Sequence, residues 1–265
     1  MKFDKQKFIN FLSNRRVPAM KPTVLFLFNS SDYAVQPWLD DGRFNVVSVD
    51  YDDTDHSGAH TKPTEGHHRL SIDLSRYGSL TVSSELTHIG MAQPSLVISF
   101  APCTDLAVSG AAHFARKRER DPQFQEKATR MAKLASEFGC PYMVENPVSV
   151  LATLWRKPDH YWHPHEYSGY CPEGPHPEFP EVIPPQDNYC KKTCLWTGNG
   201  FVMPLKKDHY IPRKTTVFPG HAKLGGKSAR TKYIRSLTPR GFARAIYEAN
   251  CENIVTFSKN PCYNA

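Results

Sequence analysis

The chain has 265 residues, of which 40% are hydrophobic and 22% are charged. These proportions exclude a disordered chain, and the length suits one large α/β domain that carries a small insert. No apolar run approaches the roughly 18 residues of a membrane span, and Met1 to Lys5 do not begin a signal peptide. We therefore expect a cytoplasmic protein without a membrane partner.

The charge of the chain is positive and unevenly placed. The formal net charge is +7, and the segment from Lys206 to Arg244 contains one acid, Asp208, among many lysines and arginines. Such a balance favours a polyanionic partner, because each neutralised phosphate releases counterions. The seven cysteines are an odd number at irregular spacing, which indicates reduced thiols rather than a disulfide framework.

The first predicted unit is a strand, a turn, a helix and a second strand. Thr23 to Phe28 form a buried strand, a helical stretch ends near Gly42, and Phe44 to Asp50 form a strand that ends in an acid. This order is typical of nucleoside binding, where an acid after the second strand accepts hydrogen bonds from ribose hydroxyls. Asp50 has an alternative role as the cap of a turn. Residues 52 to 68 are polar and predict a surface loop.

Two later strands end in polar residues whose side chains could take part in a reaction. The apolar run from Leu96 stops at Pro102, and Cys103 follows it. A helix from about Pro122 to Phe138 then leads into a strand that ends in Glu145 and Asn146. Ligands of open parallel sheets bind at the carboxyl ends of strands, so this placement favours a nucleophilic thiol. The alternative is an inert core cysteine.

These two strand ends resemble motifs of the DNA (cytosine-5)-methyltransferases. The segments 102–110 and 191–201 resemble a compact phage and prophage branch of that family, and the likeness runs from about Val24 to Asn250. The resemblance implies a Rossmann-like α/β fold with a mostly parallel sheet, helices on both faces and a small irregular recognition insert. It also implies methyl transfer from S-adenosylmethionine to C5 of cytosine in double-stranded DNA, with the base flipped out of the helix.

The resemblance assigns roles to particular residues. The thiolate of Cys103 attacks C6 of the base, Glu145 holds the ring at N3, Pro102 shapes the turn, and Asn146 orients the glutamate or the backbone. The usual glycines of the first turn are replaced by small polar residues. Asp73 has an alternative role as a helix N-cap. The residues expected at the cofactor are Phe28, Asn29, Ser30, Asp50, Tyr51, Asp73 and Ala101.

Residues 155 to 232 predict a small recognition region, between a core of residues 1 to 154 and a closing helix with a tail at 233 to 265. The tail after Asn250 is expected to be loosely attached. No arginine of the family's base-contacting motif is present, and Lys192 is the proposed substitute. The residues expected to bind DNA are Lys192, Lys206, Lys207, Arg213, Lys214, Lys223, Lys227, Arg230 and Lys232.

The same region is rich in histidine and cysteine, but its spacing matches no standard zinc finger. Packing of aromatic loops and contacts between histidine and phosphate are the favoured interpretations, so no metal is predicted. The zinc candidates are Cys171, Cys190, Cys194 and His163.

Two other functions fit the sequence. One is a DNA-binding relative with weak or no activity that shields phage DNA, and the other is C5 modification of a free pyrimidine nucleotide. The oligomeric state is left open.

Overall fold

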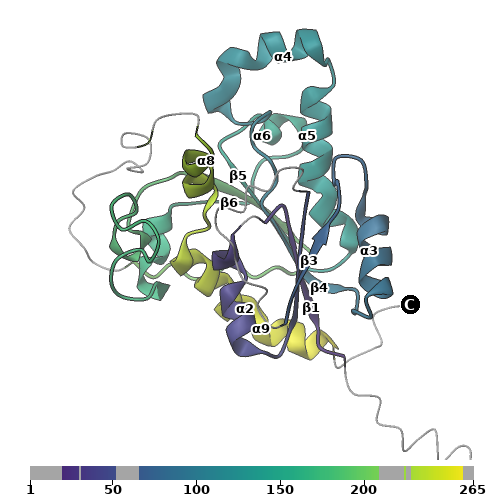
Figure 1. Cartoon of the computed structure of the whole chain (residues 1–265), viewed down its shortest axis with the longest axis vertical. Helices are drawn as coiled ribbons and strands as arrows, with labels where there is room; N and C mark the ends of the chain where they lie inside the picture. Colours follow the sequence, from purple (N-terminus) through teal and green to yellow (C-terminus); the bar gives the residue numbers. More distant parts are fainter. Residues whose placement is uncertain (1–19, 30, 52–65, 209–223, 225–227, 259–265) are drawn as a thin grey trace, which may run out of the picture.

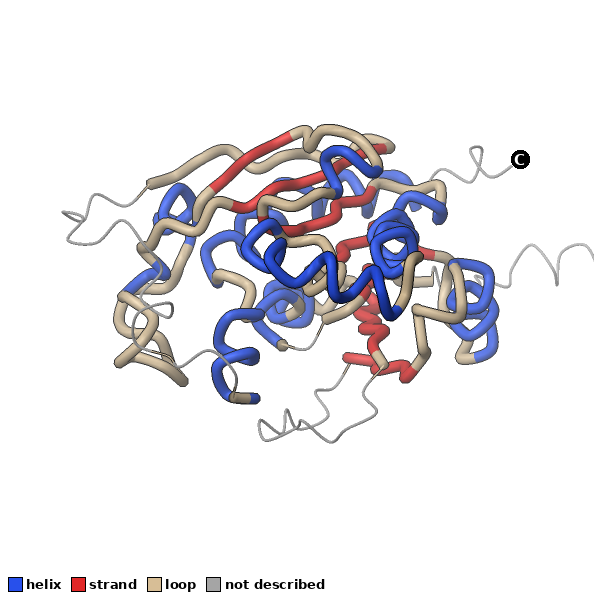
Figure 2. Tube along the Cα trace, turned by 90° about the horizontal axis from the view of Figure 1, so that it is seen from above, coloured by secondary structure: helices blue, strands red, loops and turns tan. Residues whose placement is uncertain are grey.

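The computed structural model describes residues 20–29, 31–51, 66–208, 224 and 228–258. They form a seven-stranded sheet in the order β3-β2-β1-β4-β5-β7-β6, drawn as one continuous layer in Figure 2. The strands are β1 (Thr23–Leu27), β2 (Asn45–Asp50), β3 (His67–Ser71), β4 (Pro94–Ser99), β5 (Tyr142–Pro147), β6 (His160–Trp162) and β7 (Thr193–Gly198). Neighbouring strands are parallel, except that β7 runs antiparallel to both β5 and β6.

Helices cover both faces of this sheet (Figure 1). Alternate residues of the central strands point to opposite faces, so Leu25 packs with α3 and α5 while Val24 packs with α2 and α9. All five residues of β1 are buried, as expected of a parallel strand covered on both sides. The helices are α2 (Gln36–Asp41), α3 (Ser79–His88), α4 (Phe114–Arg120), α5 (Phe124–Lys133), α6 (Leu151–Leu154), α8 (Ala229–Ser236) and α9 (Arg240–Ser258). The predicted Rossmann-like architecture is confirmed.

Several predicted boundaries agree with the structure. Gly42 ends α2 in the left-handed conformation with φ 71°, and Gly139 does the same after α5 and the 3₁₀ helix η3 (Leu134–Phe138) with φ 73°. A glycine adopts this conformation without the steric cost that a side chain adds. Among the described helices, none has the length and apolar character needed to cross a membrane.

Three predictions about local structure were wrong. β3 begins at His67, inside the expected loop, and β6 lies in a stretch that showed no strand pattern. β3 pairs with β2 alone at the edge of the sheet, so it need not carry a run of apolar residues. β6 is only three residues long, which is too short to give a recognisable pattern. Residues 251–258 of the expected loose tail instead end α9, where Cys251 and Ile254 are buried in the core, and residues 259–265 lie outside the described residues.

The region after β6 packs directly on α9. Trp162 and Phe242 stack with ring centroids 3.6 Å apart, and Tyr167 contacts Phe242 edge to face at 5.0 Å. A Cβ atom at Gly241 would lie 2.2 Å from the carbonyl oxygen of Tyr167, so this crossing requires glycine. The 3₁₀ helices η4 (Pro164–Tyr170) and η5 (Pro185–Asp187) therefore lie against the start of α9. β7 returns to the main sheet beside β5, and β6 pairs with β7 at the edge of that sheet.

A buried ion pair fixes the start of α9. The carboxylate of Asp187 accepts hydrogen bonds from the backbone N–H of Arg240 at 2.6 Å and from its guanidinium at 3.0 Å. The two side chains are 3% and 11% exposed. Removing one partner of such a pair leaves an uncompensated buried charge, which costs more than the intact pair contributes.

We expect Asp187→Asn to lower the free energy of unfolding by about 3 kcal/mol, because Arg240 then keeps its charge without a counterion. Asn suits this position because residue 187 has φ 52°, and Asn tolerates the left-handed region. Urea denaturation followed by circular dichroism measures the change. The control is Glu248→Gln, which breaks the exposed pair with Arg244 and should cost about 0.5 kcal/mol or less. Equal losses in the two variants would contradict the role of burial.

Candidate active site

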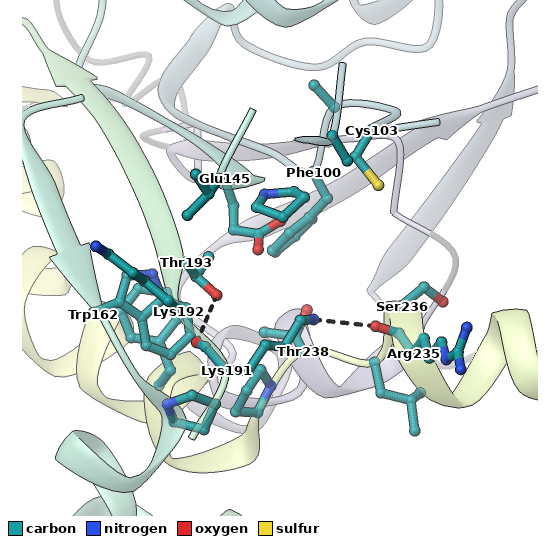
Figure 3. A pocket seen from close by; sticks show the side chains of 18 of the residues that line it. Phe100, Cys103, Glu145, Trp162, Lys191, Lys192, Thr193, Arg235, Ser236 and Thr238 are labelled. Atoms are coloured by element: carbon teal, nitrogen blue, oxygen red, sulfur yellow. Dashed lines mark hydrogen bonds between the residues drawn. The ribbon is translucent and has the colours of Figure 1, made fainter. Parts of the chain in front are cut away.

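A cavity of about 660 Å³ opens where the carboxyl ends of β1, β4 and β5 meet. Strand ends supply its floor, and the start of β7 together with the α8–α9 connection supplies its roof (Figure 3). The floor residues include Phe28, Asn29, Phe100, Ala101, Pro102, Cys103 and Glu145. The roof residues include Lys191, Lys192, Thr193, Arg235, Ser236, Leu237 and Thr238. The structure thus brings together the two strand ends singled out in the sequence.

The turn after β4 presents Cys103 to the cavity. The carbonyl oxygen of Cys103 accepts hydrogen bonds from Leu106 N at 3.0 Å and Ala107 N at 2.8 Å, which holds the turn closed. The thiol is half-buried, and burial raises its pKa above the usual value. The nearby Glu145 raises this pKa further, while Lys191 lowers it. In the folded chain at neutral pH the residue is therefore a thiol that needs activation before it attacks.

Glu145 faces the same cavity from β5 (Figure 3). Burial raises the pKa of this carboxyl, and Lys191 partly offsets the rise. A carboxyl that holds its proton can donate a hydrogen bond to a ring nitrogen, which an ionised one cannot. The site therefore pairs a nucleophile with a potential acid.

Asn146 lies behind the cavity and joins the two strand ends. Its Nδ2 donates to the carbonyl oxygen of Ala101 at 2.9 Å, and the residue is fully buried. Its Oδ1 is buried without a hydrogen-bond partner. Pro102 stands exposed at the rim, between the buried Ala101 and the half-buried Cys103. Asn146 thus acts on the backbone beside the nucleophile rather than on a ligand.

Lys191 lines the cavity together with Lys192, the lysine that was proposed from the sequence, and with Arg235. Lys191 Nζ donates to the carbonyl oxygen of Arg235 at 3.1 Å, and its charge lowers the pKa of both Cys103 and Glu145. Lys192 also lines the cavity, but its Nζ lies over the Tyr161 ring, 4.8 Å from the centroid. The sequence shows two adjacent lysines before a strand, and this pattern does not indicate which of the two acts on Cys103 and Glu145.

The expected cofactor residues divide into two groups. Phe28, Asn29 and Ala101 line the cavity, while Asp50, Tyr51 and Asp73 lie outside its lining and Ser30 lies outside the described residues. Asp73 Oδ1 accepts from Ser75 N at 3.0 Å, so this residue caps a turn and not a helix, since Gly78 is the N-cap of α3.

The loop after β1 is built without glycine. Phe28 adopts the left-handed conformation with φ 56°, and Asn29 Nδ2 donates to Ser48 Oγ at 3.3 Å. His67 Nε2 lies 2.9 Å from the same hydroxyl, and burial lowers the pKa of His67 to about 4. Ser31 Oγ is buried with no hydrogen-bond partner. The described residues after β1 thus include one buried hydroxyl group without a hydrogen-bond partner.

Among the expected DNA-binding residues that the structure describes, all but Lys192 lie outside the cavity lining. Lys206 pairs with Glu166 at 2.7 Å, Lys207 lies 5.3 Å from the Tyr170 ring centroid, and Arg230 pairs with Glu181 at 2.7 Å. Lys232 is exposed on α8. The expected residues Arg213, Lys214, Lys223 and Lys227 lie outside the described residues.

The zinc candidates are separated by the fold. Cys194 is buried in the core beneath the sheet, and Cys171 is buried against Gly241. Cys190 and His163 instead lie close to His165, another histidine of the same region. Cys190 and Cys194 have different surroundings, since Cys190 lines the cavity and Cys194 is buried in the core.

No protein-family model matches the chain, and neither does any curated protein. Among solved structures, it is similar to that of a protein proposed to be a DNA modification methyltransferase encoded within a prophage of E. coli. The TM-score is 0.41 at 12% sequence identity, over 67% of this chain and 46% of the other. The chain thus spans less than half of that protein's length. The function is therefore inferred from the side chains of the cavity.

We expect Lys191→Gln to raise the pKa of the Cys103 thiol, because the substitution removes the charge that favours the thiolate. Only the thiolate is alkylated, so at neutral pH iodoacetamide should modify Cys103 more slowly in this variant. Mass spectrometry of the Cys103 peptide across a pH series measures the rate. Lys191→Arg keeps the charge and should behave like the unmodified chain. An unchanged pH profile in Lys191→Gln would show that this lysine does not act on the thiol.

Proposed function

We propose that this chain transfers a methyl group from S-adenosylmethionine to C5 of cytosine in DNA. The observation that carries the proposal is the meeting of Cys103 and Glu145, from the ends of β4 and β5, in one cavity. The sheet order and the antiparallel β7 place these strand ends where open α/β sheets bind ligands. The resemblance of both strand ends to the cytosine-5 family supports the same reaction.

The chemistry needs a covalent step because C5 of cytosine is a poor nucleophile. The Cys103 thiolate adds to C6, and the electron pair of the C5–C6 double bond moves so that C5 can take the methyl group. A proton then leaves C5, the electron pair returns to the ring, and the bond from sulfur to C6 breaks. Two lower barriers replace one high barrier.

The residues around the thiol fit this sequence of steps. Glu145, whose pKa is raised by burial, donates a hydrogen bond to N3 and stabilises the negative charge that develops when sulfur adds to the ring. Lys191 favours the thiolate of Cys103. Asn146 keeps the Pro102–Cys103 turn in register with Glu145 through its bond to Ala101.

The residues after β1 and β2 fit S-adenosylmethionine, which supplies an activated methyl group on a sulfonium. Phe28 and Asn29 line the cavity, and the hydroxyl of Ser31, outside the lining, is buried without a hydrogen-bond partner. Asp50 ends β2, with one carboxylate oxygen held by Tyr51 N at 2.8 Å. The carboxylate of Asp50 would accept hydrogen bonds from ribose, and Phe28 and Asn29 would contact the rest of the ligand.

DNA is the substrate that the charge of the chain favours. Lys192 and Arg235 stand in the cavity roof, where each side chain can approach a phosphate next to a flipped base. The excess of basic residues between Lys206 and Arg244 would contact the backbone on either side. Binding should therefore weaken as salt concentration rises.

Methyl transfer tests the proposal directly. With labelled S-adenosylmethionine and unmodified DNA, we expect 5-methylcytosine in the digested nucleosides, and none with Cys103→Ala. Cys140→Ser is the matched control, because Cys140 is a half-buried cysteine outside the cavity lining. Full activity in Cys103→Ala would overturn the covalent mechanism. Product from dCMP but not from DNA would move the substrate to free nucleotides, and DNA binding without cofactor binding would indicate an inactive relative.

DNA that carries 5-fluorocytosine offers a second readout. Fluorine at C5 blocks the final loss of a proton, so the adduct between Cys103 and C6 should accumulate. Denaturing electrophoresis and mass analysis of the Cys103 peptide would detect it. Methylation at a nitrogen or oxygen atom would leave no such adduct.

A further inference from the structure

Beside the cavity lies a cluster that methyl transfer does not use, formed by His163, His165 and Cys190. Each offers one ligand atom, and these atoms all lie within 4.8 Å of one another. His163 and His165 flank the first residue of η4, and Cys190 comes just before β7. The imidazole rings of the two histidines are nearly parallel, with centroids 5.5 Å apart and an interplanar angle of 26°.

Two nitrogen atoms in this cluster have unsatisfied hydrogen-bonding capacity. The Nδ1 atoms of His163 and His165 are buried and have no hydrogen-bond partner. The His165 side chain is only 9% exposed. Buried polar atoms in folded proteins nearly always have a partner, so two orphaned nitrogens beside a thiol call for an explanation.

The cluster is held together by contacts between backbone segments. His165 N donates to the carbonyl oxygen of Tyr189 at 3.2 Å, which joins the start of η4 to the residue before Cys190. His163 N donates to Glu166 Oε2 at 2.8 Å. The ligand atoms are therefore brought close by the fold before any ion binds, which reduces the entropy lost on binding.

We infer that His163, His165 and Cys190 bind a zinc ion. Donor atoms on one zinc ion lie about 3 to 4 Å apart, given bonds of ~2.0 Å to nitrogen and ~2.3 Å to sulfur. Small rotations of the side chains bring the present spacing to that range. Two imidazoles with one thiolate are a borderline donor set that suits Zn²⁺ over Mg²⁺ or Ca²⁺.

Charges of both signs lie near the cluster, since Glu166 and Asp208 are acids while Lys192 and Lys206 are bases. The thiol of Cys190 binds as a thiolate and releases its proton to solvent. The carboxylate of Asp208 lies 3.6 Å from His165 Nδ1 and adds negative charge beside the ion. Cys190 also lines the cavity, so the fourth position of the ion is within reach of water. The site would fasten η4 to the segment that carries Lys191, and it does not depend on methyl transfer.

Metal content tests the inference without any assay of activity. The full chain, purified under reducing conditions, should contain one zinc ion per molecule by elemental analysis. X-ray absorption of this protein should show two nitrogen ligands and one sulfur ligand. A chelator should lower the melting temperature, because the ion binds the folded chain. Protein without zinc that also fails to take up added zinc, or a zinc shell without sulfur, would refute the site.

Variants separate this site from adventitious binding. With Co²⁺ in place of zinc, we expect a thiolate-to-metal charge-transfer band that Cys190→Ser abolishes. His165→Asn should weaken zinc binding at least about 100-fold, since losing a direct ligand costs no less than losing a supporting contact. Cys140→Ser and His88→Asn change a cysteine and an exposed histidine elsewhere and should leave the band intact. A band that persists in Cys190→Ser would place the cobalt on other thiols.

Discussion

The candidate active site depends on one buried hydrogen bond, from Asn146 Nδ2 to the carbonyl oxygen of Ala101. β4 and β5 pair only up to Ser99 and Val144, so backbone bonds do not join the two strands beyond these residues. The side chain of Asn146 continues the connection where the strands diverge. Cys103 and Glu145 lie close in sequence to the two bonded residues. The bond therefore fixes the position of the nucleophile relative to the acid. The Oδ1 atom of Asn146 is buried without a hydrogen-bond partner, which lowers the stability of the folded chain. The fold keeps Asn146 at this position despite that cost.

Electrostatics divides the site into a floor and a roof. Burial raises the pKa of both Cys103 and Glu145, so the floor favours their neutral forms. Lys191 enters from the roof and opposes that effect on both residues. Its Nζ is held by the carbonyl oxygen of Arg235, at the end of α8. The position of α8 is fixed by Ile234 and Leu237, which pack with residues 182, 183 and 189 of the preceding region. The reactivity of the thiol is thus coupled to the packing of a segment far away in sequence.

The sequence predicted the floor well because its signals are local. An apolar run that stops at Pro102 places Cys103 at a strand end, and the run before Glu145 does the same, whatever the rest of the chain does. The roof could not be predicted in this way, since Lys191 and Arg235 meet through the fold. β3 was not predicted because a strand paired on one side has no strict apolar pattern. The end of α9 was not predicted because few of its residues are buried.

The region between β6 and β7 shows how an irregular segment acquires a defined shape. It has little regular structure, and its aromatic residues gain stability by packing on α9, as the stack of Trp162 on Phe242 shows. Gly241 permits the close approach, and the pair of Asp187 with Arg240 fixes the register of the helix against it. These contacts hold one side of the region. Its other side, where η4 meets the start of β7, is joined by the His165 to Tyr189 hydrogen bond, and a zinc ion on His163, His165 and Cys190 would complete the attachment next to Lys191.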